Sequence, residues 1–213
     1  GLIERSNDYA VELGNRLRDR VYGSVLPKLS KGIANTRNLK EPTVADLAET
    51  YDMALTMLFR ILCIAYAEDR RLLPYRVNTE YTRVAIKTLA GSLSKGELPK
   101  FKPDETTLWD RVREVVQAIH NGRDDWDLPE YRGTPFSEEE GKSPSGARLA
   151  QISLSDDLFG PVLVDLLTDE AEDGEVGPID FSSLGVREFG TIYEGLLESE
   201  IALAVQDLAE DRE

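Results

Sequence analysis

The chain has 213 residues, of which 41% are hydrophobic and 31% charged, and its formal net charge is −15. This is the composition of an ordinary globular protein, which excludes an intrinsically disordered chain and allows a sizeable core. The single cysteine, Cys63, excludes a disulfide framework and favours the cytoplasm.

The charge is distributed unevenly along the chain. Residues 1–103 carry 12 acidic and 17 basic side chains, whereas residues 104–213 carry 28 acidic and 8 basic ones. A basic half could face nucleic acid, while an acidic half would be repelled from phosphates. Two differently solvated faces explain the same asymmetry without a nucleic acid.

The first predicted element is an amphipathic helix, because apolar residues recur three or four positions apart from Ile3 to Leu29. Gly23 and Pro27 should bend or end this helix, since proline removes an amide donor and clashes one turn back.

A long second helix should begin at Thr43, with Asp46 completing a capping-box-like pair, and should end near Leu73 because a proline follows. The stretch Met53–Ala67 is apolar on nearly every side. It carries Arg60 and is shorter than the roughly 20 residues that a bilayer requires. We therefore expect a central core helix and no membrane span.

Asn78 or Thr79 can cap a third helix that ends between residues 91 and 95, and residues 95–104 hold breakers typical of a surface loop. Asp104 or Thr106 can cap the next helix. Its apolar face is periodic from residue 108 to 119, and Asn121-Gly122 should end it in the left-handed conformation.

Residues 122–147 show no helical period, and a stretch of this length is usually functional or mobile. Trp126 in this stretch either packs on a partner or anchors the loop. Helices should resume near Arg148 and again from Ser155, the latter short or broken at Pro161. Residues 169–178 form an acidic loop.

A final helix should begin near Gly185, and Glu200–Val205 is the only plausible strand. The pattern predicts a mainly α protein, an irregular multi-helix bundle with long loops and little or no β-structure. We expect one helical domain over residues 1–213, with any sub-boundary near 122–147.

Catalytic patterns are sparse. The single histidine, His120, lies in the last turn of a predicted helix, where it suits the helix dipole. Zinc requires more cysteine and histidine ligands than this chain has. Asp104, Glu140 and Lys142 match the letters of a metal-dependent nuclease. They fall at a helix cap and in a glycine-rich loop, which cannot hold a metal rigidly.

Several separated stretches resemble one known protein group. They are Leu58–Pro74 (LFRILCIAYAEDRRLLP), Leu108-Trp109, Ile119–Gly122, Tyr131–Phe136 and Ile179–Glu198 (IDFSSLGVREFGTIYEGLLE). The chain resembles a region of the adenine-specific DNA methyltransferases found in type IIG restriction-modification enzymes and the related BREX phage-defence systems. The resemblance spans nearly the whole chain, and its last stretch is the most specific.

The resemblance implies a helical connector that precedes the methyltransferase domain of the same parent chain. That domain would bind S-adenosylmethionine and double-stranded DNA. This chain has neither an Asn/Asp-Pro-Pro-Tyr/Phe motif for the flipped adenine nor a glycine-rich strand end for the cofactor. We therefore expect no catalytic residue, cofactor or metal in it. Arg71 stands where the family pattern often has glycine.

The resemblance also names candidate residues. A carboxylate–guanidinium network could lock the turn at the end of the central helix. Candidates for docking the neighbouring domain are Tyr66, Glu68, Asp69, Arg70, Gly190, Tyr193 and Glu194. If the isolated chain binds DNA, the candidate phosphate contacts are Arg70, Arg71, Lys95, Lys100 and Lys102. Competing hypotheses are a stand-alone acidic DNA mimic or protein-interaction module, and the nuclease above.

Overall fold

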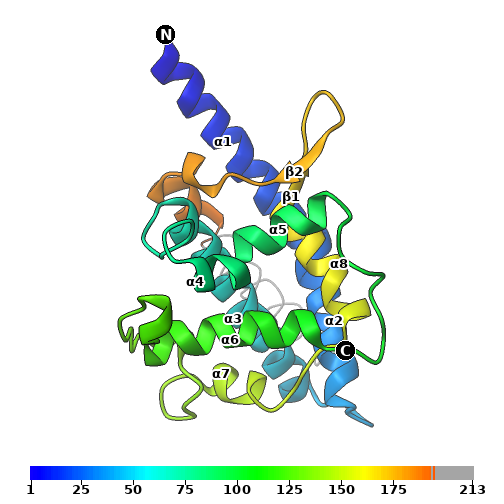
Figure 1. The fold of residues 1–213 in the computed structure, drawn as a ribbon. Helices are drawn as coiled ribbons and strands as arrows, with labels where there is room; N and C mark the ends of the chain where they lie inside the picture. The colour runs from blue at the N-terminus through cyan, green and yellow to red at the C-terminus, as the bar shows by residue number, and fades with distance from the viewer. Residues whose placement is uncertain (193, 195–213) are drawn as a thin grey trace. The chain divides into compact units, whose positions relative to one another are not determined.

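The structure is a computed structural model that describes residues 1–192 and 194 (Figure 1). These residues divide into two compact units. Gly1–Gly23 and the described residues from Ser182 onwards form the smaller unit, and Ser24–Phe181 forms the larger. The segment 122–147 lies within the larger unit. Helices predominate and the described residues contain one two-stranded sheet, which confirms the predicted mainly α fold.

Helical structure continues from α1 (Leu2–Arg20) through a π-helical segment (Val21–Val25) to α2 (Leu26–Arg37). Of the two predicted effects of Gly23 and Pro27, bending or ending the helix, the structure excludes the ending, because helical structure extends to the end of α2. The chain widens into a π-helical turn at Gly23, and Pro27 falls in the first turn of α2, where proline is tolerated.

Helix α3 (Val44–Asp69) begins as predicted. The Thr43 hydroxyl accepts a hydrogen bond from the Asp46 amide at 3.2 Å, and the Asp46 carboxylate accepts one from the Thr43 amide at 2.8 Å. This capping box satisfies two amides that the helix itself leaves free. Helix α3 packs against α2, α5 and α7, so it is the central helix of the larger unit.

By length and composition α3 could cross a membrane, but 56% of its most apolar window is buried inside the chain. Within that window Arg60 is only 2% exposed, and it donates hydrogen bonds of 2.7 Å to the carbonyl oxygens of Pro135 and Ser137. Burial lowers the Arg60 pKa to about 10. The surroundings of α3 therefore agree with the predicted core helix.

The predicted helix from Asn78 to residue 95 is two helices, α4 (Thr79–Val84) and α5 (Ile86–Ser94), separated by Ala85 in an extended conformation. The start is confirmed, because the Asn78 side chain accepts a hydrogen bond from the Tyr81 amide at 2.9 Å. The break was missed because nothing near Ala85 in the sequence is a helix breaker. Its cause lies in the side chains described below.

Helix α6 (Thr107–Asn121) ends before Gly122 as predicted, but the predicted left-handed conformation was wrong, because the φ of +76° at Gly122 is combined with an extended ψ of 157°. Thr106 is the N-cap residue, one of the two predicted, but its side chain does not cap the helix. The capping carboxylate belongs to Asp156, which accepts hydrogen bonds from the Leu108 amide at 2.9 Å and from the hydroxyl of the helix's first residue. Asp156 is distant in the sequence, so no local signal could reveal it.

Three further elements complete the larger unit. Helix α7 (Pro144–Leu149) begins slightly before its predicted place, and α8 (Asp156–Leu167) runs unbroken through Pro161. The proline costs one hydrogen bond, but α8 buries an apolar side against α2, α5 and α6. The predicted acidic loop is a hairpin of two short antiparallel strands, β1 (Thr168–Glu170) and β2 (Val176–Pro178).

In the smaller unit, a helix covers residues 186–192 and begins as predicted, with the Gly185 amide donating to the Glu188 carboxylate at 2.9 Å. The predicted strand Glu200–Val205 lies outside the described residues.

Candidate functional site

The most heavily bonded group at the end of α3 is the carboxylate of Glu68, which is 1% exposed. It accepts hydrogen bonds from the Tyr81 hydroxyl at 2.6 Å, the Ile86 amide at 3.0 Å and the Lys87 amide at 2.8 Å. Burial raises the Glu68 pKa to about 7, and these three bonds oppose the shift. Glu68 thus supplies the N-terminal cap that Ala85 cannot give to α5.

Arg111 caps the other side of the same break. Its guanidinium donates to the carbonyl oxygens of Arg83, Val84 and Ala85 at 3.0, 3.1 and 3.3 Å, at the C-terminal end of α4. An anion at one helix start and a cation at the preceding helix end complement both helix dipoles. The pair of Glu68 and Arg111 therefore explains why the chain breaks at Ala85.

Asp69 connects α3 to the chain after β2. Its carboxylate lies 3.0 Å from the Lys87 ammonium and accepts a hydrogen bond from the Phe181 amide at 2.8 Å. Lys87 also donates to the Ile179 carbonyl oxygen and lies 5.3 Å from the centre of the Phe181 ring. Burial raises the Asp69 pKa, and Lys87 opposes that shift. The predicted carboxylate–guanidinium network with Arg70 is replaced by an ion pair between Asp69 and the Lys87 ammonium.

Helix α3 ends in a Schellman motif. The Leu72 amide donates to the Ala67 carbonyl oxygen at 2.8 Å, and the Arg71 amide donates to the Glu68 carbonyl oxygen at 3.1 Å. Arg71 takes the left-handed position, with φ of +59°, where glycine is the usual residue. Arg70 is exposed, and its Nε donates to the Tyr66 hydroxyl at 3.2 Å. The Schellman motif at Arg71 ends α3 before the predicted Leu73.

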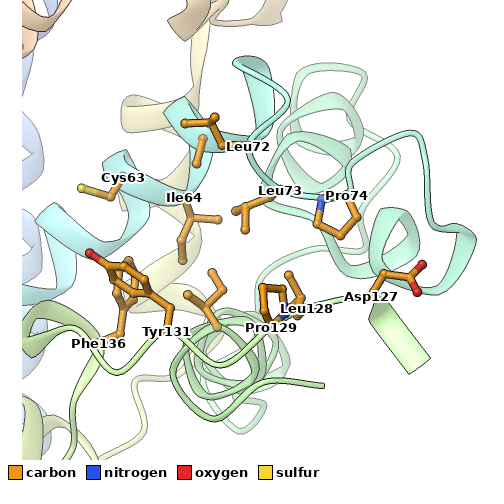
Figure 2. Close-up of a pocket in the computed structure, with 12 residues that line it drawn as sticks. Cys63, Ile64, Leu72, Leu73, Pro74, Asp127, Leu128, Pro129, Tyr131 and Phe136 are labelled. Carbon is orange, nitrogen blue, oxygen red and sulfur yellow. The ribbon is translucent and has the colours of Figure 1, made fainter. Parts of the chain in front are cut away.

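Beside this turn is an apolar cavity of about 400 Å³, which we call the α3 pocket. Figure 2 shows side chains of α3 and the following turn facing those of the segment after α6. Its lining residues are Cys63, Ile64, Ala67, Leu72, Leu73, Pro74, Ile119, Asp127, Leu128, Pro129, Tyr131 and Phe136. Burial raises the Cys63 pKa to about 12, so the thiol is a weak nucleophile.

The segment after α6 is anchored by Trp126, which is 3% exposed. Its ring packs edge-on against Tyr81 at 5.8 Å between ring centres, and the Arg123 guanidinium lies 3.8 Å from the ring centre. Trp126 therefore anchors the loop, which decides between the two predicted roles. Gly122 is required at the start of the loop, because a Cβ there would lie 3.0 Å from the Glu130 amide nitrogen.

The candidate DNA contacts are divided between two segments. The turn with Arg70 and Arg71 lies at the left of Figure 1, and the 95–106 segment runs down its right edge. Lys102 lies 2.5 Å from Glu105, and this hydrogen bond raises the Lys102 pKa. The Lys95 ammonium lies farther from its carboxylate partner, 3.9 Å from Glu97. Lys100 is exposed. The five cations do not form one patch.

The nuclease candidates lie on separate segments. Asp104 is exposed in the turn before α6, whereas Glu140 is exposed in the turn before α7. Lys142 in that second turn lies 2.8 Å from Glu139. Among the described residues no three His, Cys, Asp or Glu side chains group to hold a metal ion. The Nδ1 atom of His120, in the last turn of α6, is buried and has no hydrogen-bond partner among the described residues.

The remaining docking candidates lie near residue 190. Gly190 is in the 186–192 helix, and a Cβ there would meet nothing within 4 Å among the described residues. Glu194 is exposed, and Tyr193 lies outside the described residues.

Tyr81, Lys87, Arg111 and Asp156 carry much of this arrangement and were not singled out from the sequence. The one available signal is Lys87, a lysine beside the apolar residues Ile86, Leu89 and Ala90. No protein-family model matches the chain, and comparisons with curated proteins and with solved structures found no similar protein.

Proposed function

We propose that this chain is a non-catalytic helical connector of an adenine-specific DNA methyltransferase of the type IIG restriction-modification or BREX kind. It holds neighbouring domains of the parent protein in position. The methyltransferase domain of that parent binds S-adenosylmethionine and double-stranded DNA in the cytoplasm. The proposal assigns neither cofactor nor catalytic residue to this chain, because it lacks the motifs that hold the flipped adenine and the cofactor.

The observation that supports the proposal is that the stretches carrying the resemblance meet in space. Asp69 binds the Phe181 amide across 112 positions of sequence. Ile119, Tyr131 and Phe136 line the α3 pocket together with the end of the α3 motif. Short stretches that resemble the family by chance would not be expected to contact one another, whereas the stretches of a connector shared with the family would.

A second observation concerns Arg71, where the family pattern often has glycine. The position is the left-handed C-terminal residue of a Schellman motif, which is the place where glycine is favoured. The departure from the family pattern therefore keeps the backbone geometry that a family glycine would serve.

The test is N6-methyladenine sequencing of DNA exposed to the intact parent protein and S-adenosylmethionine. We expect methylation at a defined sequence by the wild-type parent. Replacing Asp69 with alanine should lower that methylation while cofactor binding by the parent is retained, since Asp69 supports the connector only. Glu41→Ala, which removes an exposed carboxylate that belongs to no candidate site, is the matched control and should leave methylation unchanged. A parent that leaves adenine unmodified would contradict the proposal.

A further inference from the structure

The α3 pocket is bordered by exposed apolar side chains. Leu72 and Tyr131 line it yet are 72% and 57% exposed, and Val77 on the adjoining turn is 83% exposed. Large apolar side chains grouped beside a cavity are characteristic of an interaction site rather than of an ordinary surface. The apolar surface thus extends beyond the volume of the pocket itself.

The unpaired charge at this edge is positive. Arg71 and Arg76 are exposed, and no ion pair of either with a carboxylate is found among the described residues. The Arg76 guanidinium lies 5.1 Å from the centre of the Tyr75 ring. Both have left-handed backbones, with φ of +59° and +63°, which costs about 1 kcal/mol or more for each non-glycine residue. Asp127 is the only charged residue in the described lining, and its carboxylate accepts a hydrogen bond from the Asn78 amide at 2.7 Å.

We propose that the α3 pocket binds an acidic amphipathic segment of another polypeptide. An apolar side chain of that segment enters the pocket, and its flanking carboxylates lie against Arg70, Arg71 and Arg76. A cavity of about 400 Å³ would suit a small molecule by volume. A small molecule inside it would leave Leu72 and Val77 uncovered, whereas a peptide helix or strand covers pocket and rim together.

This inference goes beyond the proposed function, because it does not depend on what the parent protein catalyses. It commits to acidic peptide chemistry because no ion pair to a carboxylate is found for Arg70, Arg71 or Arg76 among the described residues. Carboxylates are the groups that arginine binds best, through paired hydrogen bonds.

The test uses two labelled peptides that form amphipathic helices with a leucine face. One has glutamate at the remaining positions, and the other has lysine. Fluorescence anisotropy should show the glutamate peptide binding the wild-type chain and the lysine peptide failing to bind. Bound peptide should also slow alkylation of Cys63, the only cysteine in the chain, because that thiol lines the pocket.

Three variants locate the binding. Arg71→Glu should weaken the glutamate peptide about five-fold, as loss of a surface ion pair implies. Leu72→Asp should weaken it about ten-fold or more, since it removes an apolar contact from a side chain that is 72% exposed. Ala67→Phe fills the cavity from α3 and should abolish insertion. Lys100→Glu makes the same charge change elsewhere and should leave the affinity unaltered.

Four results would overturn the proposal. The first is equal binding of both peptides, and the second is no binding of either peptide to the wild type. The third is binding that survives Ala67→Phe and Leu72→Asp in chains whose circular dichroism is native. Occupation of the pocket by a second copy, seen as pocket-dependent dimers in sedimentation, would also refute it.

Discussion

Replacing Tyr81 with phenylalanine removes one hydroxyl from the centre of the larger unit and changes nothing else. Tyr81 is fully buried, and its hydroxyl donates to the Glu68 carboxylate at 2.6 Å. The ring of phenylalanine keeps the edge-on contact with Trp126. The substitution therefore isolates one bond of the α3 end.

The expected loss follows from the kind of bond. In a buffer above pH 7 the Glu68 carboxylate is ionised, and a hydrogen bond to an ionised acceptor contributes about 2 kcal/mol to the free energy of unfolding, roughly twice a neutral one. For a chain of this size such a loss lowers the melting temperature by about 4–8 °C. In a Glu68→Gln background the bond has a neutral acceptor, so Tyr81→Phe should cost only about 1 kcal/mol there.

Urea unfolding followed by far-ultraviolet circular dichroism measures both values, and the matched control is Tyr131→Phe. Tyr131 is 57% exposed, so loss of its hydroxyl should change the unfolding midpoint very little. If Tyr81→Phe costs no more than Tyr131→Phe, the Glu68 carboxylate does not hold α3 to α5, and the reasoning fails.

Three other predictions concern the end of α3 and the start of α6. Burial raises the Glu68 pKa from 4.5 to about 7, so the folded chain binds a proton that the unfolded chain has lost. The free energy of unfolding should therefore fall as pH rises from about 4.5 to about 7, and Glu68→Gln should flatten that part of a urea-unfolding pH series; an unchanged slope would contradict the raised pKa. Arg71→Gly should raise the free energy of unfolding by about 0.5–1 kcal/mol, because glycine adopts the left-handed backbone without strain. Arg71→Ala should not raise it, and a glycine variant less stable than the wild type would argue against the Schellman geometry. Asp156→Ala should cost about 1–2 kcal/mol because the Leu108 amide loses its cap, while Thr106→Ala, at the position favoured by sequence, should cost much less; the reverse order in thermal melts would show the cap to be local.

The parts of the fold predicted from sequence are those with local causes. Thr43 and Asp46 lie three positions apart and cap α3 as predicted. The break between α4 and α5 could not be predicted, because the carboxylate that caps α5 belongs to Glu68. Glu68 lies 18 positions before Ile86, whose amide donates the hydrogen bond. Residue chemistry alone cannot reveal a cap that folding brings from another helix.

The hairpin and the end of α3 were missed for related reasons. Strands β1 and β2 have three residues each and include acidic or turn-forming positions, so propensity gives little signal. Pro74 indicated an end near Leu73, but the Schellman motif stops α3 earlier with arginine in place of the glycine that normally marks it. The α3 pocket also could not be foreseen, since its walls come from segments far apart in the sequence.

The most direct measurement of the central claim is the coding sequence that surrounds this segment in its gene. The proposed connector role predicts an open reading frame that continues past the codon for Glu213 into a glycine-rich strand end and an Asn/Asp-Pro-Pro-Tyr/Phe motif. A stop codon directly after Glu213, or a continuation without those motifs, would contradict it.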